Sequence, residues 1–369
     1  MTHRLCQLLV ALLLVVGPVS CTRPPELVGI DNATKPVAAH REATRRKVFI
    51  ATTREATEVI GAFYSADRAP ALGFASVVVS IPPNHVPGTI ERPKKLPPDP
   101  DTEFAVIEPT VFGNGDVFAR QIDRALAELP PEDRHVLFFV HGYNNTISDS
   151  ILRIAQFVED TNFNGVPVLF SWASAGRTTH YVYDLNSALI ARPKLIQAAR
   201  YLATTKAEGF SVFAHSMGSL LLVEAIVEEK LNGTYDTRAR IDNVMLAAPD
   251  IDLDLFKTQL AYLNQQQKNF YVFVSKNDRA LGFSKRISGG IERVGNANAV
   301  ELAELGVSVI DLSEIEDSTS GSHSKFAGSP EVVQLIGKGL SKGTFREGQQ
   351  APTLVEVLGG VPVLKVLVD

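Results

Sequence analysis

From residue 47 onward, short apolar runs of the chain alternate with longer segments whose apolar residues recur at helical spacing. This alternation is typical of a mostly parallel sheet covered by helices. Several short runs are apolar at successive positions, as in strands buried under helices on both faces. The sequence therefore predicts an α/β fold with a doubly wound, mostly parallel sheet. We expect strands over residues 48–51, 75–81, 136–140, 166–172, 210–214, 243–247, 270–275 and 307–312.

The segments with helical spacing lie between the later strands. Helices are expected over residues 147–159, 187–204, 219–231, 253–265 and 330–340. Asp252 and Ser329 each precede one of these helices and are candidate N-caps. Residues 82–100 hold seven prolines, and proline removes the backbone donors that regular structure needs. That stretch should be a surface excursion.

The first twenty residues have the composition of a signal peptide. Arg4 supplies a positive charge, and residues 8–16 are unbroken apolar residues, fewer than the roughly 20 that a membrane-spanning helix needs. The residues before Cys21 resemble a bacterial lipoprotein cleavage box, although Pro18 stands where the box prefers leucine. Export is therefore expected. Either a lipid on Cys21 anchors the chain to the cell envelope, or the chain is a soluble periplasmic or secreted protein.

The rest of the chain divides by composition. Residues 21–46 are polar, contain prolines and show no sustained period, which predicts a flexible tether. A single α/β domain is expected over residues 47–343. Residues 344–369 form a C-terminal extension of unknown role.

Charge and cysteine content exclude several classes of function. The net charge is −5, without the basic face of a nucleic-acid-binding protein, so no nucleic-acid partner is expected. Cys6 lies in the signal segment, which leaves Cys21 as the one cysteine of the exported chain and excludes an intramolecular disulfide. The sequence has no HExxH motif and no cysteine pair, so neither a metal nor a cofactor is expected. The oligomeric state is not indicated.

The most informative motif is Ala214-His215-Ser216-Met217-Gly218, between an expected strand and an expected helix. A serine in a G-x-S-x-G-like pattern at a strand-turn-helix junction is typical of a nucleophile elbow, in which a strained turn lifts the hydroxyl clear of the sheet. Alanine in place of the first glycine adds only a methyl group. The pattern also occurs by chance, and the strand-to-helix setting is what favours the elbow. We therefore expect Ser216 to be a nucleophile.

A nucleophilic serine that attacks a carbonyl needs hydrogen-bond donors for the developing oxyanion. In this type of elbow one donor is the amide of the next residue, here Met217. The second should follow an earlier strand, and His141-Gly142-Tyr143-Asn144 directly follows the strand expected over 136–140. The Tyr143 amide is then the second donor. The alternative is that these residues form an ordinary turn.

The base and the acid follow from the order of residues in such folds, which is serine, acid, histidine. Of the eight histidines, only His323 lies beyond Ser216, so His323 is the candidate base. Asp278 follows the strand expected over 270–275 and is the favoured acid. Asp250, after the preceding strand, is the alternative, whereas Asp252 is better explained as a helix cap.

Together these residues resemble a bacterial α/β-hydrolase family of unknown function, the DUF900 group, which is described as esterase/lipase-like. The resemblance covers about residues 47–325. It implies hydrolase activity and supports Asp278 and His323, but it implies no particular substrate. Ala173 departs from the family, which tends to have proline there. The matching pieces are Ala51-Thr52-Thr53-Arg54, Ser80-Ile81-Pro82, His141-Gly142-Tyr143-Asn144, Ser171-Trp172-Ala173-Ser174-Ala175-Gly176, Tyr181 with Asp184, Ala214-His215-Ser216-Met217-Gly218, Ala248-Pro249-Asp250-Ile251-Asp252 and Ser275-Lys276-Asn277-Asp278-Arg279-Ala280-Leu281.

The segment from Trp172 to Asp184 follows an expected strand at the edge that carries the nucleophile. Trp172, together with Asn144, is a candidate for the rim of a substrate site. Equally, Trp172 could pack beneath the loop and Asp184 could cap the next helix.

The resulting expectation is a serine hydrolase that cleaves carboxylic esters of small molecules or lipids through an acyl-enzyme. An acyltransferase or a peptidase would use the same residues. A non-catalytic envelope binding protein on the same fold is the alternative from another class.

Overall fold

The computed structural model describes residues 23–234, 241–263, 270–315, 322–341 and 363–364. The expected signal segment and Cys21 lie outside the described residues, as does all of the expected C-terminal extension except residues 363–364. Among the described helices, none combines the length and the apolar character needed to cross a bilayer.

A ten-stranded sheet runs through the molecule in the order β10-β9-β8-β7-β6-β4-β5-β1-β2-β3. The neighbours from β9 to β1 are parallel, and β2, β3 and β10 are added antiparallel. The strands are β1 Thr44–Ala56, β2 Tyr64–Ile81, β3 Ala105–Phe112, β4 His135–Val140, β5 Val166–Ser171, β6 Gly209–His215, β7 Ile241–Ala247, β8 Phe270–Val274, β9 Ser308–Asp311 and β10 Val363–Leu364.

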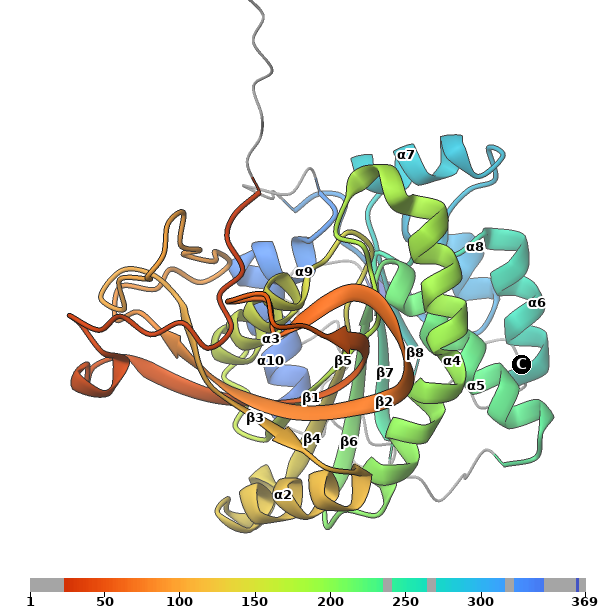
Figure 1. The fold of residues 1–369 in the computed structure, drawn as a ribbon. Helices are drawn as coiled ribbons and strands as arrows, with labels where there is room; N and C mark the ends of the chain where they lie inside the picture. Colours follow the sequence, from red (N-terminus) through yellow and green to blue (C-terminus); the bar gives the residue numbers. More distant parts are fainter. Residues whose placement is uncertain (1–22, 235–240, 264–269, 316–321, 342–362, 365–369) are drawn as a thin grey trace, which may run out of the picture.

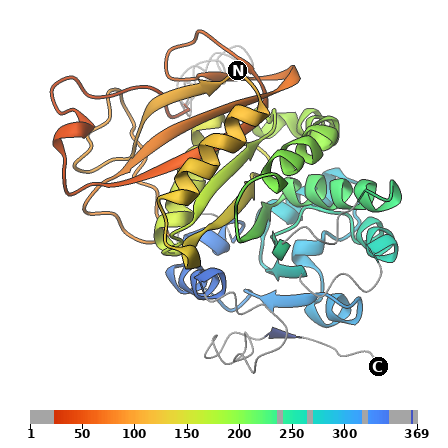
Figure 2. The ribbon, with the colours of Figure 1, turned by 90° about the horizontal axis from the view of Figure 1, so that it is seen from below.

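Helices cover both faces of this sheet (Figures 1 and 2). One face packs against α2, α4, α5, α6 and α8, and the other against α3, α9 and α10. The helices are α2 Gly115–Ala127, α3 Ile147–Asp160, α4 Tyr181–Ala203, α5 Met217–Leu231, α6 Leu253–Leu263, α7 Arg279–Ile287, α8 Ala299–Glu304, α9 Lys325–Gly328 and α10 Pro330–Ser341, with short 3₁₀ turns at Val37–Ala39, Pro131–Asp133, Thr178–His180 and Val294–Asn296.

Strand β4 shows why the apolar runs require two helical layers. Successive side chains of a strand point to opposite faces. Val136 and Phe138 belong to the core on the α4 and α5 side, whereas Leu137 and Phe139 belong to the core on the α3 side. A strand with both faces apolar can bury them only between two layers, and this confirms the predicted doubly wound sheet.

All eight expected strands and all five expected helices are present, with shifted ends. Asp252 caps α6 as expected, because its Oδ1 accepts hydrogen bonds from the amides of Asp254 and Leu255. Residues 82–100 contain no helix or strand. The edge strand β3 was not expected, because its outer half is exposed and interrupted by Glu108 and Pro109.

The segment expected to be a flexible tether is instead packed on the domain in its described part, from Arg23 onward. Leu27 and Val28 are buried. The Val28 amide donates to the Gly61 carbonyl, and the Gly29 amide donates to the Val106 carbonyl, both at 2.8 Å. The polar composition of the segment masks this short apolar stretch, whose backbone groups pair with Gly61, between β1 and β2, and with Val106 of β3.

The parallel strands all end at the same edge of the sheet, at the top of Figure 1. The loops after β4, β5, β6, β7 and β8 therefore converge there. In α/β sheets ligands bind at this carboxyl edge.

Candidate active site

Ser216 lies in the turn between β6 and α5. Its backbone has φ 54° and ψ −125°, a region that residues other than glycine rarely adopt and that stores strain. The Ser216 amide donates to the Ala247 carbonyl at 2.9 Å, which ties the turn to β7. A serine in this conformation has the backbone of a nucleophile elbow.

Two glycines allow the elbow to interlock with the loop after β4. A Cβ at Gly218 would overlap the carbonyl oxygen of His141, and a Cβ at Gly142 would lie 2.8 Å from the Cβ of Ser216. Neither position has room for a larger residue. The close approach places Tyr143, which follows Gly142, beside the serine.

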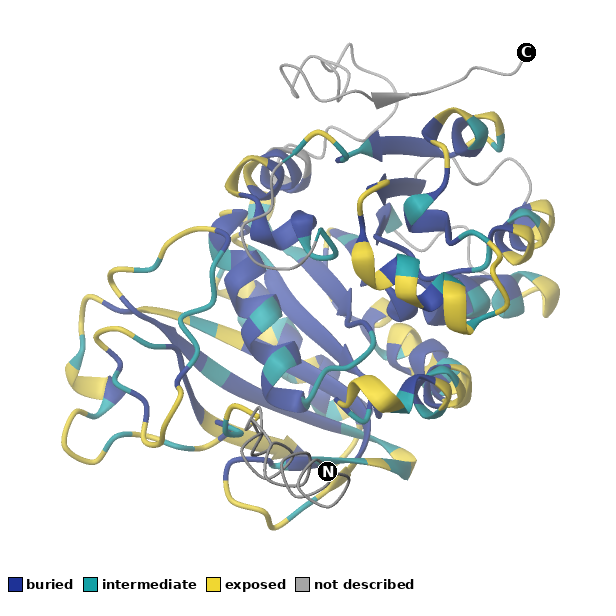
Figure 3. Cartoon of the chain, turned by 90° about the horizontal axis from the view of Figure 1, so that it is seen from above, coloured by how far each residue is buried: buried dark blue, intermediate teal, exposed yellow. Residues whose placement is uncertain are grey.

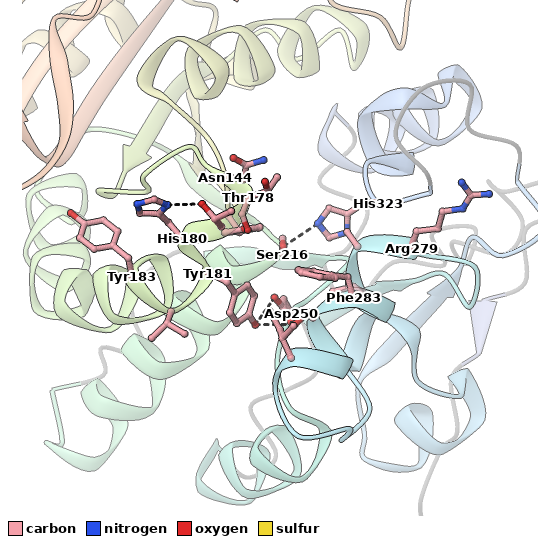
Figure 4. Close-up of a pocket in the computed structure, with 17 residues that line it drawn as sticks. Asn144, Thr178, His180, Tyr181, Tyr183, Ser216, Asp250, Arg279, Phe283 and His323 are labelled. Atoms are coloured by element: carbon pink, nitrogen blue, oxygen red, sulfur yellow. Dashed lines mark hydrogen bonds between the residues drawn. The ribbon is translucent and has the colours of Figure 1, made fainter. Parts of the chain in front are cut away.

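The structure brings together the serine, histidine and aspartate that the sequence singled out. His323 Nε2 lies 3.1 Å from Ser216 Oγ, and His323 Nδ1 lies 2.7 Å from Asp278 Oδ2. Figure 4 shows the His323 ring directed at Ser216 across the pocket. The second oxygen of Asp278 accepts the Leu281 amide at 3.0 Å and so caps α7. Both oxygens of this buried carboxylate are thereby fixed.

Asp250, the alternative acid, is engaged elsewhere. Its carboxylate accepts hydrogen bonds from the Tyr181 hydroxyl at 2.9 Å and the Ser284 hydroxyl at 2.6 Å, and Arg293 Nε lies 3.4 Å away. Burial raises the pKa of Tyr181 to about 12, so this hydroxyl stays a donor. Asp250 therefore belongs to the pocket wall and is not the partner of His323.

His215, next to Ser216, supports the histidine loop. Burial and the neighbouring His323 hold the pKa of His215 well below its usual value, so it is neutral. Its Nε2 lies 3.1 Å from the His323 carbonyl oxygen. A carbonyl only accepts, so this nitrogen carries the proton and donates. The His215 ring also packs on Phe326, with centroids 4.7 Å apart.

Lys325 joins the loop of the histidine to the loop of the aspartate. This lysine is buried, and its Nζ donates to the Leu312 carbonyl at 2.8 Å and to Asn277 Oδ1 at 3.0 Å. Asn277 precedes Asp278, and Lys325 follows His323 by two residues. Sequence reasoning missed both Lys325 and His215. A lysine inside an otherwise apolar short helix was the available signal.

The expected oxyanion donors are the amides of Met217 and Tyr143. The Met217 amide is in the first turn of α5, where helix amides lack an intrahelical partner. The Tyr143 hydroxyl donates to the Thr178 carbonyl, which fixes the ring across the pocket. Burial raises the pKa of Tyr143 to about 12, so its hydroxyl keeps its proton.

Arg54 holds the loop of Tyr143 from beneath. It is buried, and its guanidinium donates to the Asn145 carbonyl at 2.7 Å, the Ser174 carbonyl at 2.9 Å and Ser171 Oγ at 2.9 Å. Burial lowers the pKa of Arg54 to about 10, which leaves it charged at neutral pH. Arg54 therefore cross-links the loops after β4 and β5.

Asp184 binds the amide groups of the same two loops. Its carboxylate accepts hydrogen bonds from the Asn144 amide at 3.2 Å, the Ala175 amide at 2.7 Å and the Ser174 hydroxyl. It lies in the first turn of α4 but serves these loops, not its own helix. Sequence reasoning did not assign either charge to the site, although Arg54 and Asp184 both fall in pieces that carry the family resemblance.

Trp172 does not lie on the rim of the site. Its side chain is fully buried and stacks on His141, with ring centroids 5.0 Å apart, and its Nε1 donates to the His141 carbonyl at 2.7 Å. Burial and the charge of Arg54 lower the pKa of His141 to about 3. Trp172 thus packs beneath the loop, because the strand before it delivers its ring into the core. Asn144, in contrast, lines the pocket.

Ser216 and His323 open onto a pocket of about 1060 Å³. One wall is formed by residues 178–183 and the other by α7 (Figure 4). Exposed apolar side chains edge both walls: Val182 is 68% exposed, Phe283 50% and Ile287 48%. The pocket therefore combines a serine at its floor with exposed apolar side chains on both walls. Within the described ranges, no group of three or more His, Cys, Asp or Glu side chains is placed to hold a metal ion.

Comparison with known families agrees with this arrangement. The model of a family described as alpha/beta hydrolase of unknown function (DUF900) matches residues 118–339, more than half of the chain. No curated protein matches the chain. The matched range includes the elbow, the loop of Tyr143 and the positions of Asp278 and His323. The chain belongs to this α/β-hydrolase family.

Proposed function

We propose that this protein is a serine hydrolase that cleaves carboxylic esters through a covalent acyl-enzyme. Family membership supports a hydrolase-type function. The observation that carries the ester proposal is the hydrogen-bonded series Ser216–His323–Asp278 at a strained elbow that opens onto a pocket. Nucleophile, base and orienting acid in this connectivity are the arrangement that acyl transfer needs.

In the first half-reaction, His323 Nε2 accepts the proton of Ser216 Oγ as the oxygen attacks the carbonyl carbon of the ester. The amides of Met217 and Tyr143 stabilise the negative charge on the carbonyl oxygen. The tetrahedral intermediate then collapses. The carbon–oxygen bond to the alcohol breaks, and His323 donates its proton to the departing oxygen. Asp278 orients the imidazole and stabilises its charged form.

In the second half-reaction, water attacks the acyl group on Ser216. His323 takes a proton from this water, and the same two amides stabilise the second tetrahedral intermediate. The bond to Ser216 Oγ breaks, and His323 returns the proton to the serine. The products are a carboxylic acid and the free enzyme.

The pocket wall favours an apolar group on the substrate. Three of the polar side chains that line the pocket, those of Tyr181, Ser284 and Asp250, hydrogen-bond to one another. Both walls also offer exposed apolar side chains to a substrate, Val182 on one wall and Phe283 on the other, beside polar lining residues such as Arg279. We therefore propose small-molecule or lipid esters with an apolar acyl or alkyl group as substrates.

A fluorophosphonate probe tests this function directly, because it forms a stable bond only with an activated serine. The wild-type chain should be labelled and Ser216→Ala should not, while Ser219→Ala, which changes a serine in the first turn of α5, should still be labelled. A folded wild-type chain that resists the probe would refute the hydrolase and support a non-catalytic binding protein. Product analysis with added alcohols or amines then separates hydrolysis from acyl transfer.

We also propose that the chain is exported to the cell envelope, where a lipid on Cys21 anchors it. Metabolic labelling with a fatty-acid analogue should mark the wild type and not Cys21→Ser. An unlabelled wild type recovered from the periplasm would support the soluble exported form.

A further inference from the structure

Helix α7, which forms one wall of the pocket, presents cations and apolar side chains together. Arg279, Phe283, Arg286 and Ile287 are all exposed. Their positions i, i+4, i+7 and i+8 lie on one helical face. Lys285 adds a third cation, and the nine residues of α7 contain no acidic residue. Lys285 is half-buried, whereas the other four are exposed. We call the side chains of Arg279, Phe283, Lys285, Arg286 and Ile287 the α7 surface.

The positive charge of the α7 surface is not neutralised locally. Within the described part of the chain, Arg279, Lys285 and Arg286 form no salt bridge. The whole chain, in contrast, has a net charge of −5. A cluster of free cations on an acidic molecule is a local feature of this edge, and it matches an anionic partner.

Apolar exposure continues across the mouth of the pocket. Val182, on the opposite wall, is the most exposed of the apolar lining residues, and Ile291, shortly after α7, is also exposed. Figure 3, which looks down on this edge, shows exposed residues on α7 next to the buried ends of the strands. Exposed apolar groups that gather around a pocket mouth mark a binding surface, whereas scattered single ones do not.

The N-terminal segment reaches the domain at the same edge. Arg23 Nη2 lies 3.2 Å from Asp149 Oδ2, in the first turn of α3, and the Arg23 guanidinium lies against Gly176, in the loop after β5. Only Thr22 separates Arg23 from Cys21. A lipid on Cys21 would therefore tether the molecule by the edge that carries the pocket.

We propose that this edge is a docking surface for an anionic lipid bilayer, and that the pocket receives its ester from that bilayer. Cations next to exposed aromatic and aliphatic side chains are the combination that binds an anionic membrane interface. The α7 surface attracts the headgroups, and the apolar side chains around the pocket mouth contact the acyl boundary. The second part of the proposal rests on the proposed esterase function, whereas the docking itself does not.

Sedimentation with vesicles tests the docking. Full-length chains carrying Lys285→Glu/Arg286→Glu would be compared with wild type on phosphatidylcholine vesicles with and without phosphatidylglycerol. Because each cation near an anionic membrane surface strengthens binding, the variant should lose about tenfold or more of its partitioning onto anionic vesicles. Subtracting the binding to neutral vesicles removes contributions from apolar segments elsewhere. An unchanged thermal unfolding midpoint shows that the variant is folded.

Arg120→Glu/Lys206→Glu is the matched control. It changes the net charge by the same amount, but Arg120 lies on α2 and Lys206 precedes β6, toward the opposite edge of the sheet (Figure 1). This control should keep nearly all of the anionic binding. Equal losses in both double variants, or a wild type that does not distinguish anionic from neutral vesicles, overturn the proposal. A wild-type dimer that the α7 variant cannot form assigns this surface to a second copy and also overturns it.

Ser216→Ala separates the two proposals. It removes the proposed nucleophile and should bind anionic vesicles as the wild type does. If Ser216→Ala binds vesicles while the wild type hydrolyses no ester, the docking stands and the esterase fails. If the wild type hydrolyses soluble esters but binds no anionic vesicle, the esterase stands and the docking fails.

Discussion

The two sides of Ser216 are stabilised by different interactions. On the triad side, the proposed base and acid are the side chains of His323 and Asp278, and short-range contacts from His215 and Lys325 hold their loops. On the oxyanion side, the proposed donors are the amides of Met217 and Tyr143. There the loop of Tyr143 is fixed by Arg54 and Asp184, two buried charges whose partners are mostly backbone groups of adjacent loops.

This difference predicts how each side fails. Removing a side chain of the triad side removes a proton acceptor or its orientation, and no neighbour can replace it. Removing a charge on the oxyanion side leaves both donors in the chain but loosens their position. The first kind of change should nearly abolish chemistry, and the second should weaken it in graded steps.

The largest effect is expected for the serine and the histidine. Ser216→Ala and His323→Ala should each lower kcat for a short activated ester by about 10³-fold or more, because each removes a reacting group. Steady-state kinetics with purified enzymes measures this loss. If either variant keeps the kcat of the wild type, the triad is refuted, and the contrast between the two sides of Ser216 fails with it.

The two aspartates give the next test. Asp278→Asn should lower kcat by roughly 10³-fold, because the amide no longer favours the tautomer and charge that His323 needs. Asp250→Asn is the control, since its partners are Tyr181, Ser284 and Arg293 and not the histidine. It should change KM more than kcat. A larger kcat loss at position 250 would reverse the assignment of the acid.

The oxyanion side should respond more gently. Arg54→Met and Asp184→Asn should each lower kcat by about ten- to a hundredfold, less than the loss of one whole oxyanion donor. KM and the pH dependence of kcat/KM should stay close to the wild type, because the base is untouched. Affinity for a tetrahedral boronate adduct should fall in parallel with kcat.

Asp160→Asn is a suitable control for this pair. It also removes a buried charge, but Asp160 contacts His85, Gln156 and Gly88 and no group of the oxyanion side. Its effect should be on stability and not on the kcat-to-KM pattern. If Asp160→Asn lowers kcat as much as Arg54→Met does, the loss of kcat in Arg54→Met reflects general stability and not the position of the oxyanion donors.

The smallest effects concern pH. Burial lowers the pKa of His85, but its hydrogen bonds to Asp160 and Glu91 outweigh this and raise it to about 9. The stability it contributes is therefore complete below its unfolded value near 6.5 and is lost as the pH rises toward 9. Gln156 links Asp160 to the Ala327 carbonyl, close to the histidine loop. The difference in unfolding midpoint between wild type and His85→Gln should shrink over that range. A difference in unfolding midpoint that stays constant with pH would contradict this role of His85.

His141, on the oxyanion side, responds in the opposite direction. Its folded pKa of about 3 is below the unfolded value. The unfolded chain therefore binds the proton first, and stability is lost as the pH falls from about 6.5 toward 3. Unfolding midpoints recorded across this acid range measure the loss. Low pH is thus expected to destabilise the oxyanion side through His141. High pH is expected to destabilise the triad side through His85.

The same difference explains what could be predicted from the sequence. Ser216, His323 and Asp278 were predicted because their order and their positions after strands limit the choice. The sheet was predicted because strands such as β4 are apolar on both faces. Arg54 and Asp184 were not predicted as parts of the site, because their partners are backbone groups and leave no mark in residue types. For Trp172 the sequence leaves two positions open, the rim of the site and the core. Only its tertiary packing on His141 decides between them.

The N-terminal segment shows a second limit. Residues 23–46 have the composition of a linker, yet Leu27 and Val28 are buried against the antiparallel strands. Polar composition predicts solvation on average and cannot detect two apolar residues that pack on the domain.

This packing also determines the distance between the domain and any attachment ahead of Arg23. If the proposed lipid anchors the chain to a membrane, a flexible linker would allow the domain to rotate freely above that membrane, with its pocket in any orientation. A segment fixed by Leu27 and Val28, and by the contact of Arg23 with Asp149, removes that freedom. The height and tilt of the pocket would then be properties of the fold, and lengthening the chain between residues 23 and 46 would not raise the enzyme from the surface.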